Sequence, residues 1–408
     1  KMKINKIINN KALPSFCTSN IEVIKTILFF CRIKKLPCLI ECTSNQVNQH
    51  GGYTNKTPKM FIKEILSISK KIKFNSKKLF LGGDHLGPLP WKKKSKTVAI
   101  KNSISLINDY LDQKFCKIHI DTSIKCKDDK YINSDIIFER TNEILNNDNI
   151  KKKIKDTFLV VGTEVPLSGS GDNENIIKTS KKQIETEVLK FKKILKKQNL
   201  KNNIFGLVIE PGMKYMHSSV TKPNFTNFTN KKNISKKNNF VYEAHSTDYQ
   251  PKKILKQLVK NNFKFLKVGP ELTYSYSRSL FFMENIEKNN FKLKNSNIKK
   301  IIFSSMLKNK KYWEGYYQKK TPELLLNSKL DRMRYYFNTK PVVNSIRTLK
   351  KNINLLDKKS ILCFMNLTEK KEFLNFKNKK LSNFDIIKLI FISKTLKRYF
   401  SACAHRFN

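Results

Sequence analysis

The segment Leu79-Phe80-Leu81-Gly82-Gly83-Asp84-His85 is a short apolar run that ends on two glycines, an acid and a histidine. Similar runs with polar ends recur along the first two thirds of the chain, at residues 38–41, 117–121, 158–164, 207–210, 241–245 and 265–270. Short apolar runs are typical of buried parallel strands. Polar groups that follow many such strands converge on one face, which is how a (β/α)8 barrel assembles an active site.

Strands and helices alternate as far as about residue 288. We predict strands at residues 13–17, 36–42, 78–81, 117–121, 158–162, 204–209, 240–243 and 265–268, with amphipathic helices between them. Eight strands with intervening helices predict the α/β class and a TIM (β/α)8 barrel. The alternative is a doubly wound open sheet, but that fold concentrates its chemistry at one switch point, whereas here almost every strand end is polar.

Helical windows dominate beyond residue 290. We therefore predict a barrel over residues 1–290 and a helical C-terminal extension over 291–408 that packs on it. The longest irregular insertion, residues 213–239, suits a lid or a partner-binding loop.

The composition combines a sizeable apolar core with a very basic surface. The hydrophobic share is 39% and the net charge is +50, yet only 8 of the 82 basic residues are arginine. Arginine is the residue that nucleic-acid readers favour, and the lysines are spread over nearly every predicted helix. We therefore expect solvated faces, no specific nucleic-acid partner, and attraction of sugar phosphates.

Cysteine spacing and hydropathy indicate the compartment. The eight cysteines include no Cys-x-x-Cys pair, and the apolar stretch at residues 21–31 is too short to span a bilayer. The N-terminal residues lack an apolar stretch followed by a cleavage site. We expect a reduced, soluble, cytoplasmic protein without a membrane partner.

Asp84 and His85 are the first candidates for chemistry. A neutral imidazole can bind a metal ion while an adjacent carboxylate exchanges protons with a substrate. The Gly82-Gly83 pair lets the backbone approach a ligand closely. The alternative is a structural pair that caps the following helix.

Further acids and imidazoles follow other predicted strands. Glu164 and Glu210 suit metal ligands or bases, and Asp121 suits a metal or substrate hydroxyls. His119 is interpreted as a core histidine. His245 lies two residues after Glu243, so both point to the same side of an extended chain.

Two segments suit a polar ligand. The amides of Asn45, Gln46 and Asn48 follow Glu41 and can bind a polyhydroxylated molecule. The groups Ser246, Thr247 and Asp248 precede a helix start, where N–H groups hold phosphate, although a capping cluster is the alternative. Lys267 ends the eighth strand and can pair with a phosphate or form a Schiff base.

Together these segments resemble the Z-subunit family of class II D-tagatose-1,6-bisphosphate aldolases. The matching stretches are residues 40–49 with 51–54, 82–88, 117–121, 162–166, 242–250, 267–270, 331–332 with 334–336, and 344–345. The resemblance implies a non-catalytic partner that the catalytic Y subunit needs for activity and stability. The implied setting is carbohydrate catabolism of the tagatose 6-phosphate, galactitol or N-acetylgalactosamine type.

The motifs also resemble a class II aldolase site. This likeness implies a metal set of His85, Glu164 and His245, with Glu164 near a position where catalytic subunits carry histidine. It implies Zn2+ or Mn2+ as the cofactor, no nucleotide cofactor, and proton transfer by Asp84 or Glu210. The alternative function is therefore a divalent-metal-dependent ketose-phosphate 4-epimerase that acts by itself.

Overall fold

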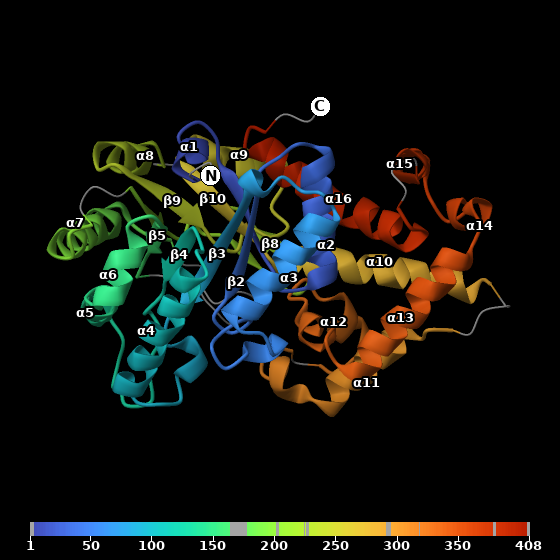
Figure 1. The fold of residues 1–408 in the computed structure, drawn as a ribbon, viewed down its shortest axis with the longest axis horizontal. Coiled ribbons are helices and arrows are strands. Elements are labelled where there is room, and N and C mark those ends of the chain that lie inside the picture. The colour runs from blue at the N-terminus through green and yellow to red at the C-terminus, as the bar shows by residue number, and fades with distance from the viewer. Residues whose placement is uncertain are drawn as a thin grey trace.

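The computed structural model describes residues 4–163, 178–200, 204–223, 225, 228–290, 295–317, 319–377 and 381–405. Eight parallel strands close into a barrel in the order β1-β10-β9-β6-β5-β4-β3-β2 (Figure 1). The strands are β1 Leu13–Cys17, β2 Cys38–Thr43, β3 Leu79–Leu86, β4 Lys117–Ile120, β5 Phe158–Val161, β6 Phe205–Val208, β9 Phe240–Ala244 and β10 Phe263–Val268. The predicted TIM barrel is confirmed, because each barrel strand pairs with the next one along the chain.

Helices surround the barrel. They are α2 Ile21–Ile33, α3 Pro58–Lys71, α4 Lys96–Asp112, α5 Ser134–Leu145, α6 Asp148–Ile154, α7 Lys181–Lys197, α8 Phe228–Lys237, α9 Lys252–Lys260 and α10 Pro270–Lys288. Capping residues fix several of their starts. The Asn20 side chain accepts hydrogen bonds from the N–H groups of Glu22 and Val23, and Ser180 forms a capping box with Gln183 at the start of α7.

The insertion at residues 213–239 is more regular than the sequence predicted. It contains a two-stranded antiparallel ribbon, β7 Lys214–Tyr215 and β8 Val220–Thr221, followed by α8. The sequence analysis did not predict helix α8, because this segment is mostly polar. Its buried apolar side chains are those of Phe228 and Ile234.

The N-terminal half of the barrel interior is apolar. Its side chains come from alternate strand positions: Leu13, Leu39, Phe80, Phe158, Val160, Val208, Val241 and Phe265. The short helix α1 (Ile4–Ile8) closes this end, and its three isoleucines pack into the same cluster. This half is a packed hydrophobic plug.

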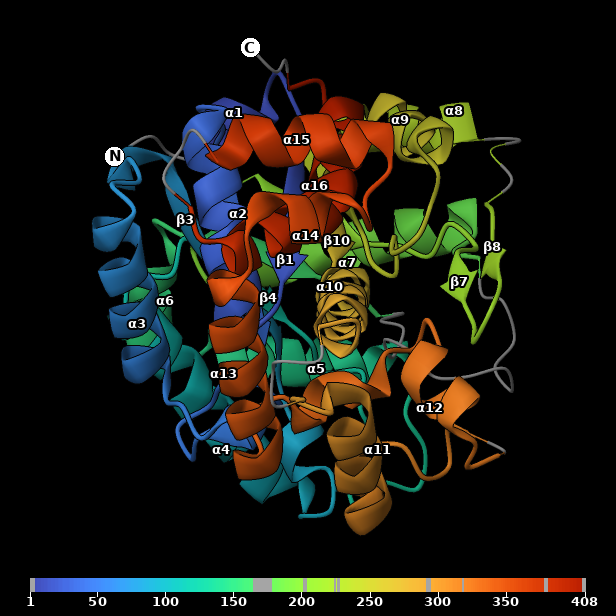
Figure 2. The ribbon, with the colours of Figure 1, turned by 90° about the vertical axis from the view of Figure 1, so that its right-hand side faces the viewer.

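In the part of the chain that the structure describes, six α-helices follow the barrel: α11 Ile298–Lys308, α12 Pro322–Asn327, α13 Lys340–Leu355, α14 Lys358–Leu362, α15 Leu367–Lys377 and α16 Asn383–Ala402. Helix α16 packs against α2, α9 and α10 and contacts β1, while α13 to α15 lie outside it (Figure 2). The last helix of the chain therefore lies between the helix that precedes β10 and the helix that follows β1. The division at residue 290 stays a prediction.

Within the described ranges, no helix is both long and apolar enough to cross a membrane.

Candidate functional site

The C-terminal half of the barrel interior is charged. Along β2, Glu41 follows the apolar Leu39 by two residues, and along β10, Lys267 follows Phe265 in the same way. Side chains two apart on a strand point to the same side, so the charged groups enter the interior directly above the apolar plug. Gly82 makes room for them, because a Cβ there would lie 2.9 Å from both Cγ and Oε1 of Glu41.

Lys117 joins two carboxylates at the base of this charged half. Its Nζ lies 2.7 Å from Glu41 Oε1 and 2.7 Å from Glu243 Oε2, and all three side chains are fully buried. Burial works against ionisation of Glu243, but Lys117 and Lys267 hold its pKa well below the ordinary value. Burial outweighs the same two lysines at Glu41 and raises its pKa. Lys117 therefore lies between two buried acids, of which Glu243 is the one whose ionised form the site favours.

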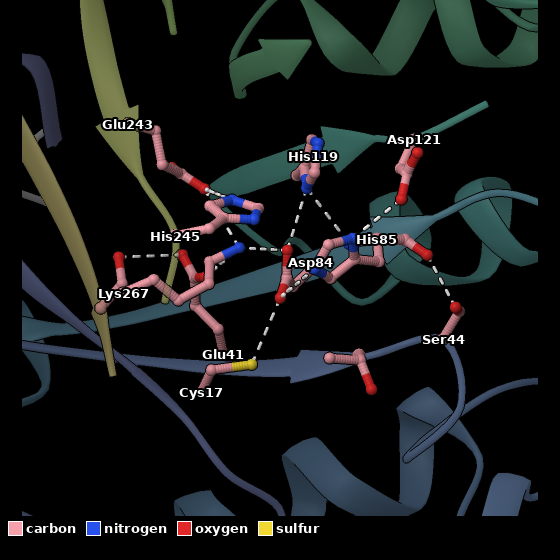
Figure 3. A network of polar contacts seen from close by, with 12 residues as sticks. Cys17, Glu41, Ser44, Asp84, His85, His119, Asp121, Glu243, His245 and Lys267 are labelled. Atoms are coloured by element: carbon pink, nitrogen blue, oxygen red, sulfur yellow. Dashed lines mark hydrogen bonds and ion pairs between the residues drawn. The ribbon is translucent and has the colours of Figure 1, made fainter. Parts of the chain in front are cut away.

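Lys267 extends from β10 into the same group of carboxylates. Its Nζ forms an ion pair with Asp84 Oδ1 and lies 3.1 Å from Glu243 Oε1 and 3.7 Å from Glu41 Oε2 (Figure 3). Burial would lower the pKa of Lys267, but the three carboxylates raise it above the ordinary value. Lys267 is thus a buried cation.

Asp84 is the centre of the network. Its Oδ1 lies 2.9 Å from His119 Nδ1, and its Oδ2 accepts a hydrogen bond from Cys17 Sγ at 3.3 Å. Burial opposes ionisation, but His85, Lys267 and His119 hold the pKa of Asp84 well below the ordinary value. Asp84 is therefore a carboxylate surrounded by donors.

His85 lies at the end of β3, with a left-handed backbone (φ 47°). Its Nδ1 is 2.8 Å from Asp121 Oδ2, and Ser44 donates a hydrogen bond to its carbonyl oxygen at 2.6 Å. Burial alone would lower the pKa of His85, but Asp84 and Asp121 raise it. This imidazole is the one in the network that favours its protonated form.

Four side chains gather donors suited to a metal ion. The ligand atoms of Asp84, His119, Glu243 and His245 all lie within 4.8 Å of one another. Among the described residues, His119 Nε2 and His245 Nδ1 are buried without a hydrogen-bond partner. Burial lowers the pKa of His119 and, with Lys267, lowers that of His245 to about 3, so both imidazoles are neutral, the form that binds metals.

This group differs from the metal set that the sequence suggested. His245 belongs to both sets. His85 is adjacent, with its ring centroid 5.0 Å from that of His245, but it is not among the four. Glu164 lies outside the described residues. The roles predicted for His85 and Glu164 stay predictions.

The amide side chains of the loop after β2 form hydrogen bonds to the backbone of the same loop. Gln46 Oε1 accepts a hydrogen bond from the Thr43 N–H at 3.0 Å, and the Asn48 amide donates to the Ser44 carbonyl at 2.8 Å. The Asn45 side chain is exposed. Binding of a ligand by these amides stays a prediction.

The residues after β9 tie the mouth of the barrel to neighbouring elements. Ser246 has a left-handed backbone (φ 52°), and the Thr247 hydroxyl donates to the Lys267 carbonyl oxygen. Asp248 Oδ1 accepts hydrogen bonds from the N–H groups of Gly269 and Glu271 at 3.0 and 2.8 Å. These contacts reach β10 and the start of α10, whereas the next helix, α9, has no side-chain cap at Pro251. A phosphate role for these residues stays a prediction.

Glu210 is buried just beyond the end of β6. Its main-chain N–H donates to the Thr179 hydroxyl at 2.8 Å, and its carbonyl accepts from the Thr179 N–H at 2.9 Å. Its predicted role in proton transfer stays a prediction.

Sequence reasoning gave Lys117 and Glu243 no role in the site, although it noted that Glu243 and His245 share one side of an extended chain, and it interpreted His119 as a core histidine. The available signal was the two-residue spacing in Lys117-Ile118-His119 and Glu243-Ala244-His245, which turns both members of each pair into the interior.

Comparison with known proteins agrees with this architecture. Residues 2–404 match a family profile described as D-tagatose-1,6-bisphosphate aldolase subunit GatZ/KbaZ-like. The chain is 33% identical over 364 residues to the D-tagatose-1,6-bisphosphate aldolase subunit GatZ of Escherichia coli O6:K15:H31 (strain 536 / UPEC), covering 84% of this chain and 85% of that protein. A crystal structure of a probable tagatose 6 phosphate kinase from Sinorhizobium meliloti 1021 has a TM-score of 0.84 and 25% identity, covering 96% of this chain and 100% of that one. The chain belongs to the D-tagatose-1,6-bisphosphate aldolase subunit GatZ/KbaZ-like family.

Proposed function

We propose that this chain is the auxiliary Z-type subunit of a class II D-tagatose-1,6-bisphosphate aldolase, which supports the activity and stability of a catalytic Y-type subunit. The observation that carries the proposal is the family match over residues 2–404, together with a relative named as a subunit of that aldolase. The eight free cysteines favour a reducing compartment, so the proposed location is the cytoplasm.

The site supports a role for a sugar phosphate in this function. The basic charge of the chain attracts anionic substrates, and the polar strand ends gather at one end of the barrel. At the same time, Asp84, Asp121 and Glu243 are each paired with a cation of the chain itself, namely Lys267, His85 and Lys117. Such a site suits a supporting subunit.

Co-expression with a Y-type aldolase tests the proposal. The expected result is co-elution of the two chains in size-exclusion chromatography, with higher tagatose-1,6-bisphosphate cleavage and a longer activity half-life than the Y-type chain has alone. Equal activity and half-life with and without this chain, with no co-elution, would refute it.

A second candidate is a divalent-metal-dependent ketose-phosphate 4-epimerase that acts alone. The specific observation is the four-donor group at Asp84, His119, Glu243 and His245. Zn2+ or Mn2+ held there would act as a Lewis acid; because Asp84 would then be a metal ligand, Glu210 would be the group that moves the proton. Purified chain alone, supplied with each metal, should then interconvert fructose and tagatose phosphates, and His245→Ala, which removes one of the four donors, should abolish the reaction. Absence of turnover with either metal would exclude this candidate.

A further inference from the structure

The ammonium of Lys267 lies among the same atoms that would hold a metal ion. Its Nζ forms ion pairs with two of the four candidate donors, Asp84 through Oδ1 and Glu243 through Oε1, the latter at 3.1 Å. A third carboxylate, Glu41, lies 3.7 Å away. Figure 3 shows the Lys267 side chain reaching from β10 toward Asp84, with His245 beside it.

Binding of a divalent ion and an ammonium to the same carboxylates at once is unfavourable in free energy. Both are cations, both need the lone pairs of Asp84 and Glu243, and repulsion between them is weakly screened in a buried site. The lysine is only 7% exposed, so water does little to separate the two charges.

We propose that Lys267 is the resident cation of this site, and that a divalent metal ion binds the donors Asp84, His119, Glu243 and His245 only by displacing its ammonium. The inference goes beyond the proposed function, since it concerns what the site holds whether or not the chain assists an aldolase. It predicts weak metal binding by the natural sequence, despite a donor set that is suitable in kind.

Lys117 provides a matched control. It is as deeply buried as Lys267 and is also paired with Glu41 and Glu243, but it forms no ion pair with Asp84 among the described residues. Replacing either lysine by Met removes one positive charge from the same network. Only Lys267→Met also vacates the Asp84 carboxylate.

The test is a Co2+ titration of three chelator-treated proteins: wild type, Lys267→Met and Lys117→Met. Binding is measured by calorimetry and by the visible absorption of bound Co2+. We expect Lys267→Met to bind one Co2+ per chain at least about 100-fold more tightly than wild type, and Lys117→Met to gain less than about 10-fold. Tight stoichiometric binding by wild type, or equal gains in the two variants, would overturn the proposal.

Lys267→Met leaves buried carboxylates without their cation, so its folding is a separate readout. If the variant is recovered unfolded, refolding with and without Co2+ tests whether a metal ion can replace the Lys267 ammonium. Recovery of the native circular dichroism spectrum with Co2+ in Lys267→Met, but not in Lys267→Met with His245→Ala, supports the proposal. Failure of Co2+ to restore Lys267→Met overturns it.

Discussion

The two halves of the barrel interior are built on the same strands but have opposite chemistry. In the N-terminal half, Leu39 and Phe265 pack with the isoleucines of α1, whereas two residues further along the same strands Glu41 and Lys267 form ion pairs. An apolar plug stabilises a fold directly, because its burial removes apolar surface from water. Buried ion pairs lose much of their Coulombic gain to desolvation, so they are weak contributors to stability. We interpret this difference as a sign that the charged half is retained for function.

The largest expected effect comes from removing one charge from the charged half. Lys117→Met leaves Glu243 buried without its closest cation and should reduce the free energy of unfolding by about 3–5 kcal/mol, measured by urea titration at pH 7. Adding Glu243→Gln removes the stranded carboxylate and should restore much of the loss. A Lys117→Met chain as stable as wild type would contradict this description of the network.

A cavity in the apolar half should reduce the free energy of unfolding slightly less, and a second substitution that removes a charge should not restore that loss. Leu39→Ala removes a fully buried side chain from the plug and should reduce stability by about 2–5 kcal/mol. The control is Leu189→Ala on α7, where the side chain is 67% exposed and the change should stay within about 0.5 kcal/mol. Similar losses at the two leucines would mean that the plug is not close-packed.

The boundary between the halves can be probed at Gly82. Gly82→Ala places a methyl group 2.9 Å from the Glu41 side chain and should destabilise the chain by about 1–3 kcal/mol. The double variant Gly82→Ala with Glu41→Ala should recover part of that loss, because the clash is with Glu41. Additive losses in a double-mutant cycle would show that the two residues are not in contact.

An ion pair outside the barrel gives the smallest effect. Glu22 on α2 forms an ion pair with Lys388 on α16 at 2.5 Å. Burial alone would raise the pKa of Glu22, but Lys388 and Lys25 lower it to about 2. A lowered carboxyl pKa contributes stability that is present above the unfolded value of 4.5 and lost as the pH falls toward 2. Glu22→Gln should therefore cost about 1 kcal/mol at pH 7 and much less at pH 2, where the remaining ionised fraction is being protonated. Equal losses at both pH values would assign the effect to packing.

The barrel was predictable because its signals are local. Eight apolar runs predicted eight strands, and the position of Asp84 directly after such a run placed it at the mouth. Strand β3 continues to Leu86, past the predicted end at residue 81, because Gly82 to Asp84 pair in register with Glu41 to Thr43 of β2. The hydropathy of residues 79–86 alone does not reveal this pairing with β2.

The ion network was predictable only in part, because it depends on distances between strands. Lys117 is one of many lysines, and its burial follows from carboxylates on β2 and β9, which lie far from it in sequence. The hydroxyl of Thr247 hydrogen-bonds to the backbone of β10, a contact between distant segments that the sequence does not reveal. The sequence shows which strand ends are polar, whereas the partners of the individual side chains require the fold.

The most direct test of the central claim is the unfolding free energy of one triple variant, Glu41→Met, Lys117→Met and Glu243→Met, at pH 7. These changes remove the buried triad at the base of the charged half and leave Lys267 paired with Asp84. If the charges are kept for function, the variant should be as stable as wild type or more stable. A loss of more than about 3 kcal/mol would contradict the account, because the triad would then be holding the barrel together.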